Sequence, residues 1–231
     1  MARSSATFLG GSALGTMTCN VTGFSLIIGL LSGMDTLCAQ AHGAGNFRRV
    51  GVVAQRGLLV CLAACVPIAA LWCIGIEPLL LRAGQPAEIA QLAARYARMT
   101  VAVLPAYTAY ESIKRFLSSQ NVTMAPLWVA LAALPIHVLV CFALREATSL
   151  GFDAIPVANV LATYLNLAGL LLYVKCFAPH NAATWPRLTS LCEALRPRAL
   201  LQYLSLGLSG MLMTSLEWWS FELIGLGAFI F

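Results

Sequence analysis

Long apolar runs constrain this chain more than any other feature of its sequence. The stretch from Leu58 to Ile76 contains no charged residue, and the run from Leu200 to Phe231 is long enough to cross a bilayer. A transmembrane α-helix needs about 20 consecutive, mostly apolar residues. Only 10% of the residues are charged and 60% are hydrophobic, whereas about a quarter of residues are charged in soluble domains. The sequence therefore predicts an all-α polytopic membrane protein.

The apolar runs leave room for about six transmembrane helices. The predicted spans are Thr7 to Cys38, Val50 to Leu80, Ala94 to Ser118, Met124 to Leu144, Ile155 to Val174 and Leu200 to Phe231. In the first span, Gly11 and Gly15, and then Gly29 and Gly33, form small-xxx-small pairs. Such pairs predict close approach of neighbouring helices. Asn20 in the same span must face another helix or a cavity, since lipid offers its amide no partner.

The third span carries charged residues. A short amphipathic piece, Ala87 to Arg98, precedes the span or begins it, and Glu111, Lys114 and Arg115 lie towards its end. Glu111 and Arg115 are one helical turn apart. This i, i+4 spacing favours a local ion pair as the interpretation of Glu111.

Basic residues divide unequally between the connections of the predicted spans. One side receives Arg48, Arg49, Arg56, Lys114, Arg115, Lys175, Arg187, Arg196 and Arg198, and the other receives Arg3, Arg82, Arg95, Arg98 and Arg145. By the positive-inside rule the first side faces the cytoplasm. No basic run is long enough to predict binding of nucleic acid.

The eight cysteines lie mostly inside or at the ends of apolar runs, with no CxxC pair and no histidine cluster at metal-binding spacing. The sequence therefore supports neither a disulfide framework nor a zinc site, and we predict no metal and no cofactor. No nucleophile–base pair rises above chance. We accordingly expect the protein not to be an enzyme.

The last span contains an unusual acidic and aromatic stretch. Glu217 and Glu222 flank Trp218 and Trp219 within the apolar run. An acidic side chain at membrane depth costs about 2.5–3.5 kcal/mol on insertion scales, so it indicates a functional site. The alternative interpretation places both glutamates near a helix end, reaching interfacial water, with the tryptophans in the aromatic belt.

Five stretches together support a family resemblance. They are Asn20-Val-Thr-Gly-Phe-Ser-Leu, Met34-Asp-Thr-Leu-Cys-Ala-Gln-Ala-His-Gly-Ala, Arg115-Phe-Leu-Ser-Ser-Gln-Asn, Leu170-Leu-Leu-Tyr-Val-Lys and Leu216-Glu-Trp-Trp-Ser-Phe-Glu-Leu. In order and spacing the chain resembles the multidrug and toxic compound extrusion (MATE) transporters, especially their eukaryotic, plant-like branch. The resemblance covers nearly the whole chain, and its last stretch is the most specific.

The resemblance implies a fold of twelve helices in two six-helix lobes, of which this chain supplies a part. Residues 1–177 would form helices two to six of the N-terminal lobe, with the first helix missing. Residues 178–199 would form a cytoplasmic loop between the lobes. Residues 200–231 would form the seventh helix, the first of the C-terminal lobe, with the remainder missing.

The resemblance also implies a function, which is efflux of organic cations, xenobiotics or secondary metabolites driven by proton entry. Glu217 and Glu222 match the acidic pair of the seventh helix, and Trp218 adds an aromatic surface on which a flat cation can stack. Asp35, Gln40 and Asn159 lie in matched stretches or inside spans and are secondary candidates for proton or substrate binding. For each of these three, structural hydrogen bonding is the slightly favoured interpretation.

The expected partners are small organic substrates, protons and the lipid bilayer, in the plasma membrane or the vacuolar membrane. A second function stays open. The chain can instead be a truncated, non-transporting membrane protein that at most associates with full-length transporters or with itself, since one incomplete lobe cannot build a pathway between two lobes.

Overall fold

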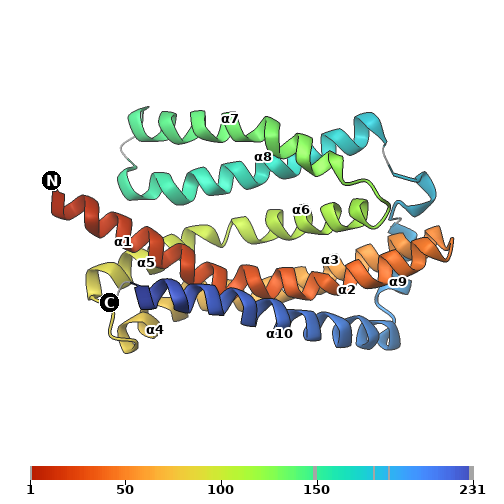
Figure 1. Ribbon diagram of the computed structural model, residues 1–231, viewed down its shortest axis with the longest axis horizontal. Coiled ribbons are helices and arrows are strands. Elements are labelled where there is room, and N and C mark those ends of the chain that lie inside the picture. The colour runs from red at the N-terminus through yellow and green to blue at the C-terminus, as the bar shows by residue number, and fades with distance from the viewer. Residues whose placement is uncertain (1, 148–149, 179, 187, 229–231) are drawn as a thin grey trace.

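The computed structural model describes residues 2–147, 150–178, 180–186 and 188–228, and this part of the chain is helical without a strand (Figure 1). The α-helices are α1 (Ala2–Cys19), α2 (Ser25–Gly43), α3 (Phe47–Ala70), α4 (Ile76–Arg82), α5 (Ala87–Thr100), α6 (Val103–Ser118), α7 (Met124–Ala147), α8 (Ala154–Phe177), α9 (Leu191–Ala194) and α10 (Pro197–Ala228). Two π-helical segments, η1 (Asn20–Phe24) and η2 (Leu71–Gly75), and three 3₁₀ turns, η3 (Gly151–Asp153), η4 (Ala182–Thr184) and η5 (Leu188–Ser190), complete the order.

The long helices run side by side along the long axis of the molecule (Figure 1). α1, η1 and α2 form one continuous rod, and α3, η2 and α4 form a second. α10 packs along α2, while α7 pairs with α8 on the opposite side of the bundle. α6 lies between these layers, in contact with α2, α3 and α8. The fold is thus a bundle of long, mostly apolar helices, as the apolar runs predict.

Five helical stretches are long and apolar enough to cross a membrane: Thr7–Gly43, Phe47–Arg82, Met124–Leu144, Gly151–Phe177 and Pro197–Glu222. Each corresponds to a predicted span. The sixth predicted span, Ala94 to Ser118, contains the end of α5 and the 16 residues of α6, with a break at Val101–Ala102. In Figure 1, α5 and α6 together still follow the length of the bundle.

Glycines allow the helices to approach, as the small-residue pairs predict. A Cβ atom added to Gly29 would lie 2.3 Å from Cα of Met211 in α10, and one added to Gly33 would lie 3.3 Å from the ring of Tyr203. Gly15 likewise faces Tyr96, since a Cβ there would lie 2.8 Å from that residue's Cβ. The prediction of close helix packing is therefore confirmed.

The linking segment between α8 and α10 folds back on the bundle rather than projecting from it. The Gln120 side-chain oxygen accepts hydrogen bonds from the Asn181 amide (3.3 Å) and the Thr184 hydroxyl (2.9 Å). A Cβ atom on Gly51 would lie 2.5 Å from the Thr184 carbonyl oxygen. These contacts attach the segment to the ends of α3 and α6. The division of the chain into two lobes at this segment stays a prediction.

Candidate functional site

The two glutamates of the acidic stretch lie on different faces of α10. Glu222 is half-buried, and the Asn20 side-chain amide donates a hydrogen bond to its Oε1 over 3.2 Å. Glu217 is exposed, and among the described residues no side chain bonds its carboxylate. Residues five positions apart on an α-helix point about 140° away from each other. One neighbouring helix therefore cannot serve both carboxylates.

The partner of Glu222 belongs to the π-helical segment η1. A π-helical turn interrupts the regular i→i−4 hydrogen bonding, and such turns recur at functional sites. The indole nitrogen of Trp219 donates a hydrogen bond to the Val21 carbonyl oxygen over 3.0 Å. Two polar contacts thus join α10 to η1, one through a carboxylate and one through an indole.

The second π-helical segment meets the first in the bundle interior. The Trp72 indole in η2 donates a hydrogen bond to the Thr22 hydroxyl over 2.9 Å, and the Trp72 ring lies edge-on to Phe24 with centroids 5.5 Å apart. A Cβ atom on Gly23 would lie 2.3 Å from the Trp72 ring, so glycine is required there. Tyr107 of α6 extends the aromatic cluster at 4.8 Å from Phe24. η1 therefore contacts Glu222 of α10 through Asn20 and contacts Trp72 in the bundle interior through Thr22 and Phe24.

Asp35 forms an ion pair with Arg115, and this corrects the predicted pair between Glu111 and Arg115. The Arg115 side chain reaches across to α2, where it also donates a hydrogen bond to the Ile28 carbonyl oxygen over 3.2 Å. Glu111 is buried and pairs instead with Lys114, one turn along α6. The physical reason is that the Arg115 guanidinium meets two residues of α2 at once, the Asp35 carboxylate and the Ile28 carbonyl, while Lys114 engages the Glu111 carboxylate.

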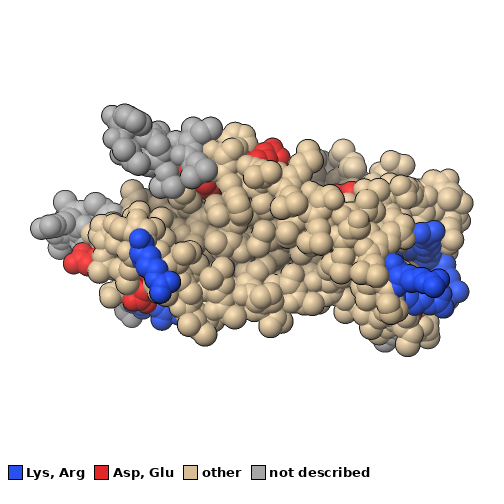
Figure 2. Space-filling model, turned by 90° about the horizontal axis from the view of Figure 1, so that it is seen from below, with Lys and Arg blue, Asp and Glu red and all other residues tan. Residues whose placement is uncertain are grey.

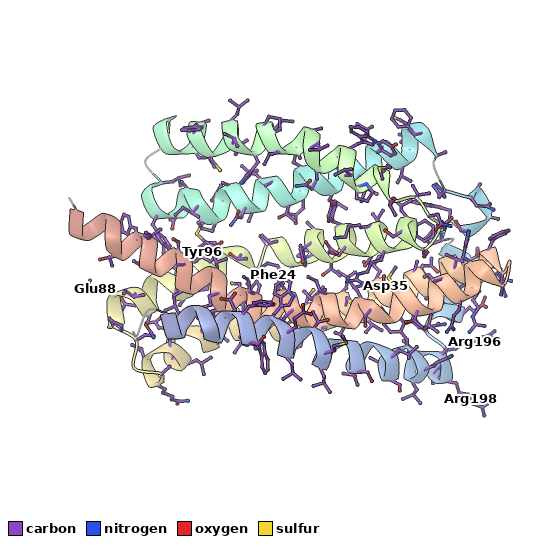
Figure 3. All side chains as sticks on the ribbon, viewed as in Figure 1. Phe24, Asp35, Glu88, Tyr96, Arg196 and Arg198 are labelled. Atoms are coloured by element: carbon purple, nitrogen blue, oxygen red, sulfur yellow. The ribbon has the colours of Figure 1, made fainter. Side chains whose placement is uncertain are left out.

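Gln40 and Asn159 lie apart from the acidic stretch. Gln40 is exposed near the end of α2, and within the described residues its side chain makes no hydrogen bond. Asn159 in α8 donates a hydrogen bond to the Tyr96 hydroxyl over 2.7 Å. Figure 3 shows Tyr96, Phe24 and Asp35 spaced along the bundle. Asn159 therefore acts as a link between α5 and α8 here, in line with the favoured structural interpretation.

Of the six candidate site residues, only Glu222 makes a side-chain hydrogen bond to η1 among the described residues. Trp218 is half-buried, and it is the neighbouring Trp219 that makes the polar contact. The sequence predicts that Asn20 faces another helix or a cavity, but it does not identify the partner, Glu222, because the two residues are 202 positions apart. Trp72 was missed altogether, because a tryptophan in an apolar run gives no signal beyond packing.

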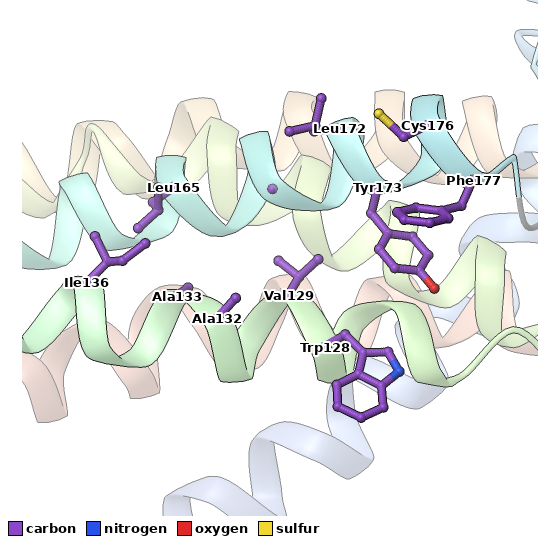
Figure 4. A pocket seen from close by; sticks show the side chains of 11 residues that line it. Trp128, Val129, Ala132, Ala133, Ile136, Leu165, Leu172, Tyr173, Cys176 and Phe177 are labelled. Carbon is purple, nitrogen blue, oxygen red and sulfur yellow. The ribbon is translucent and has the colours of Figure 1, made fainter.

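The candidate site residues do not line the main cavities of the described part of the chain. None of the six candidates lines any of four cavities of about 320–380 Å³ in the described part of the chain. The cavity between α7 and α8 is apolar, and Figure 4 shows Trp128, Tyr173 and Phe177 gathered at one end of it. Its lining suits an acyl chain rather than a charged ligand.

These features identify the general class of protein to which the chain belongs. The chain is a multi-pass helical membrane protein in which a carboxylate of the last apolar helix, α10, accepts a hydrogen bond from a π-helical segment of a neighbouring helix. The sequence profile of the MatE family matches residues 1–143. The chain therefore belongs to the MatE family, a family of transporters rather than enzymes.

Individual relatives agree over almost the whole chain. It is 36% identical over 216 residues to Protein DETOXIFICATION 16 of Arabidopsis thaliana, covering 94% of this chain and 43% of the relative. It is 34% identical over 219 residues to Multidrug and toxin extrusion protein 1 of Danio rerio, covering 95% and 36%. The crystal structure of the eukaryotic MATE transporter AtDTX14 superposes with a TM-score of 0.83 at 30% identity, over 94% of this chain and 47% of that one. The chain thus spans less than half the length of these relatives.

Proposed function

We propose that this chain is part of a secondary active transporter that exports organic cations, xenobiotics or secondary metabolites in exchange for protons. Membership of the MatE family and the names of two relatives, a multidrug and toxin extrusion protein and a DETOXIFICATION protein, support the export of organic solutes. The proton coupling and the substrate class rest on the acidic stretch of α10. The membrane concerned is the plasma membrane or the vacuolar membrane.

The contact between Glu222 and Asn20 is the single observation that carries the coupling. An ionised carboxylate accepts a charge-assisted hydrogen bond, which is roughly twice as strong as a neutral one. Proton binding at Glu222 removes that charge and weakens the hold of α10 on η1. A cationic substrate near the carboxylate competes with the proton for the same negative charge. Competition of this kind is antiport.

Glu217 and Trp218 complete the proposal from a neighbouring face of α10. The exposed Glu217 carboxylate is free of protein partners within the described residues and can meet a cation directly. An indole ring beside it offers a cation–π surface for a flat organic cation. We assign Glu217 to substrate and proton binding, and Glu222 to coupling that binding to the position of α10.

The test is exchange measured on the full-length protein in proteoliposomes that contain a proton gradient. We expect Glu217→Gln and Glu222→Gln each to lower the initial rate of proton-driven tetraethylammonium uptake at least tenfold. For Glu222→Gln, loss of one charge-assisted hydrogen bond, about 1.5–3 kcal/mol, is enough for such a change. Glu217→Gln removes the carboxylate proposed to bind the proton and the cation. Glu77→Gln is the matched control, because Glu77 is also a glutamate in a helix but pairs with Arg98 at the surface.

Wild-type rates in both α10 variants would refute the proposed roles. The same assay on the 231-residue chain alone addresses the alternative of a non-transporting membrane protein. Uptake above that of empty liposomes would contradict this alternative. Uptake at the empty-liposome level, together with recovery of the chain in pull-downs of the full-length protein, would support it.

A further inference from the structure

A basic cavity lies at one end of the bundle, away from the acidic stretch. It has a volume of about 370 Å³ and is lined by the N-terminal parts of α3 and α10 and by Glu193 of α9. Its charged lining consists of Arg48, Arg49, Arg56, Arg196 and Glu193. Four guanidinium groups against one carboxylate leave a strong positive excess. Figure 2 shows this end as the densest cluster of Lys and Arg on the face it displays.

One arginine is built into the floor of this cavity. Arg56 is only 7% exposed, and its guanidinium donates hydrogen bonds to the Ala194 carbonyl oxygen (2.8 Å) and the Glu193 carbonyl oxygen (3.2 Å). Burying a guanidinium group is costly unless it is paired. These two neutral carbonyl partners leave its positive charge uncompensated by an anion at direct contact.

The remaining arginines differ in how they are engaged. Arg48 donates to the Glu193 carboxylate over 2.9 Å, which uses the single acidic group of the lining. The side chains of Arg49 and Arg196 have no hydrogen-bond or ion-pair partner within the described residues. Two guanidinium groups, each a planar fork of donors suited to phosphate oxygens, are therefore available at the rim.

The helix ends add to the same field. α3 begins at Phe47, where the Asn46 side chain caps the Arg49 amide over 3.2 Å, and α10 begins at Pro197. The N-terminus of a long helix carries a partial positive charge that favours anions. Two such ends at one arginine-lined cavity reinforce each other.

We propose that this cavity binds a phosphate-bearing anion, with Arg49 and Arg196 as the groups that contact it and Arg56 as the buried charge beneath. The source is either the headgroup of an anionic lipid or a free phosphate, since both present the same oxygens. The cavity is lined by the beginnings of two candidate membrane spans, Phe47–Arg82 and Pro197–Glu222, and lipid headgroups contact the ends of such spans. Under the predicted orientation it faces the cytoplasmic leaflet, in which anionic lipids are concentrated.

The experiment measures binding to the detergent-purified 231-residue chain. Native mass spectrometry with phosphatidylglycerol and with phosphatidylcholine of the same acyl chains gives the selectivity for anionic lipid. We expect phosphatidylglycerol to bind at least tenfold more tightly, and Arg49→Gln and Arg196→Gln each to weaken it about fivefold. Arg198→Gln is the matched control, because Arg198 lies in the first turn of α10, two residues after Arg196, but does not line the cavity. Figure 3 labels both arginines.

A second measurement needs no variant. Phenylglyoxal modifies accessible arginines, and peptide mass spectrometry reports which ones are protected by a ligand. Protection of Arg49 and Arg196, but not Arg198, by phosphatidylglycerol alone would assign the site to lipid. The same protection by millimolar inorganic phosphate would assign it to a free phosphate. Equal binding of the two lipids without selective protection, or an equal effect of all three substitutions, would overturn the proposal.

Discussion

The contact between α2 and α10 depends on single glycines. Gly29 faces the Met211 backbone, and a Cβ atom on Gly207 would lie 2.9 Å from the Leu30 carbonyl oxygen. Backbone atoms cannot move aside as a flexible side chain can. Because lipid is as apolar as the helices, such close packing supplies much of the association energy inside a membrane. The position of α10, and with it that of Glu222, therefore rests on these residues.

Gly29→Ala is expected to separate α2 from α10 and to destabilise the chain by about 1–3 kcal/mol, the usual cost of overpacking. Gly43→Ala is the matched control in the same helix, because a Cβ there meets nothing within 4 Å and Gly43 is not among the glycines with positive φ. Thermal unfolding in detergent checks both variants. Equal unfolding midpoints for Gly29→Ala and Gly43→Ala would show that the contact is not tight.

Residue by residue, the sequence predicted types of environment better than it predicted partners. The glycine spacing marked the close contacts of Gly29. Insertion cost singled out Glu217 and Glu222 as candidate site residues, and their role stays a prediction. The pairing of Asp35 with Arg115 could not be predicted from the sequence, because it joins two helices whose relative rotation depends on the packing of the whole bundle. The local pair expected for Arg115 failed for the same reason.

Among the elements, the linking segment between α8 and α10 contains a group whose charge depends on pH. The half-buried His180 ring lies 4.7 Å from the Trp185 ring and 6.0 Å from the Phe116 ring, measured between centroids. Burial lowers the pKa of His180 below its usual value of 6.5. The unfolded segment then binds a proton more readily than the folded one. The contribution of His180 to docking is complete above about pH 6.5 and decreases as the pH falls below that value.

We therefore expect amide hydrogen exchange of residues 180–186 to accelerate between pH 7.5 and pH 5.5, after correction for the intrinsic exchange rate. His180→Phe retains an aromatic ring without a titratable group and should abolish the acceleration. His42→Phe is the control, since His42 lies in α2 and its ring contacts Phe47 rather than the segment. An acceleration that persists in His180→Phe would assign the effect to another group.

At the level of whole elements, length and hydropathy predicted the helices, and five of the six predicted spans correspond to apolar helices of membrane-crossing length. The breaks within the rods were not predictable. η1 (Asn-Val-Thr-Gly-Phe) begins at Asn20, and it is held by contacts from Trp72 and Trp219 that come from distant parts of the chain. These tertiary contacts stabilise the π-helical turn, and their partners lie too far along the chain to be predicted from the local sequence.

Across the whole molecule, the two ends of the bundle differ in how their charges are balanced. At the end with α4, α5 and η3, Arg95 pairs with Asp153 and Arg98 pairs with Glu77. At the opposite end the basic cavity leaves Arg49 and Arg196 without an acidic partner among the described residues. On the face shown in Figure 2, Lys and Arg lie at the two ends. This distribution follows the unequal division of basic residues along the sequence.

The unbalanced end should face the cytoplasm, because excess Lys and Arg near short connections resist translocation. Cys192 in α9 is exposed at that end and reports on it directly. With the protein expressed in a plasma membrane, we expect a membrane-impermeant maleimide to label Cys192 in inside-out vesicles of that membrane and not in intact cells. The Cys192→Ser variant gives the background labelling of the other exposed cysteines. Adding Ala83→Cys to this variant places a thiol at the opposite end of the bundle. We expect that thiol to be labelled from outside intact cells and not in inside-out vesicles. Labelling of Cys192 from outside intact cells would invert the orientation, and the basic cavity would then meet the outer or lumenal leaflet.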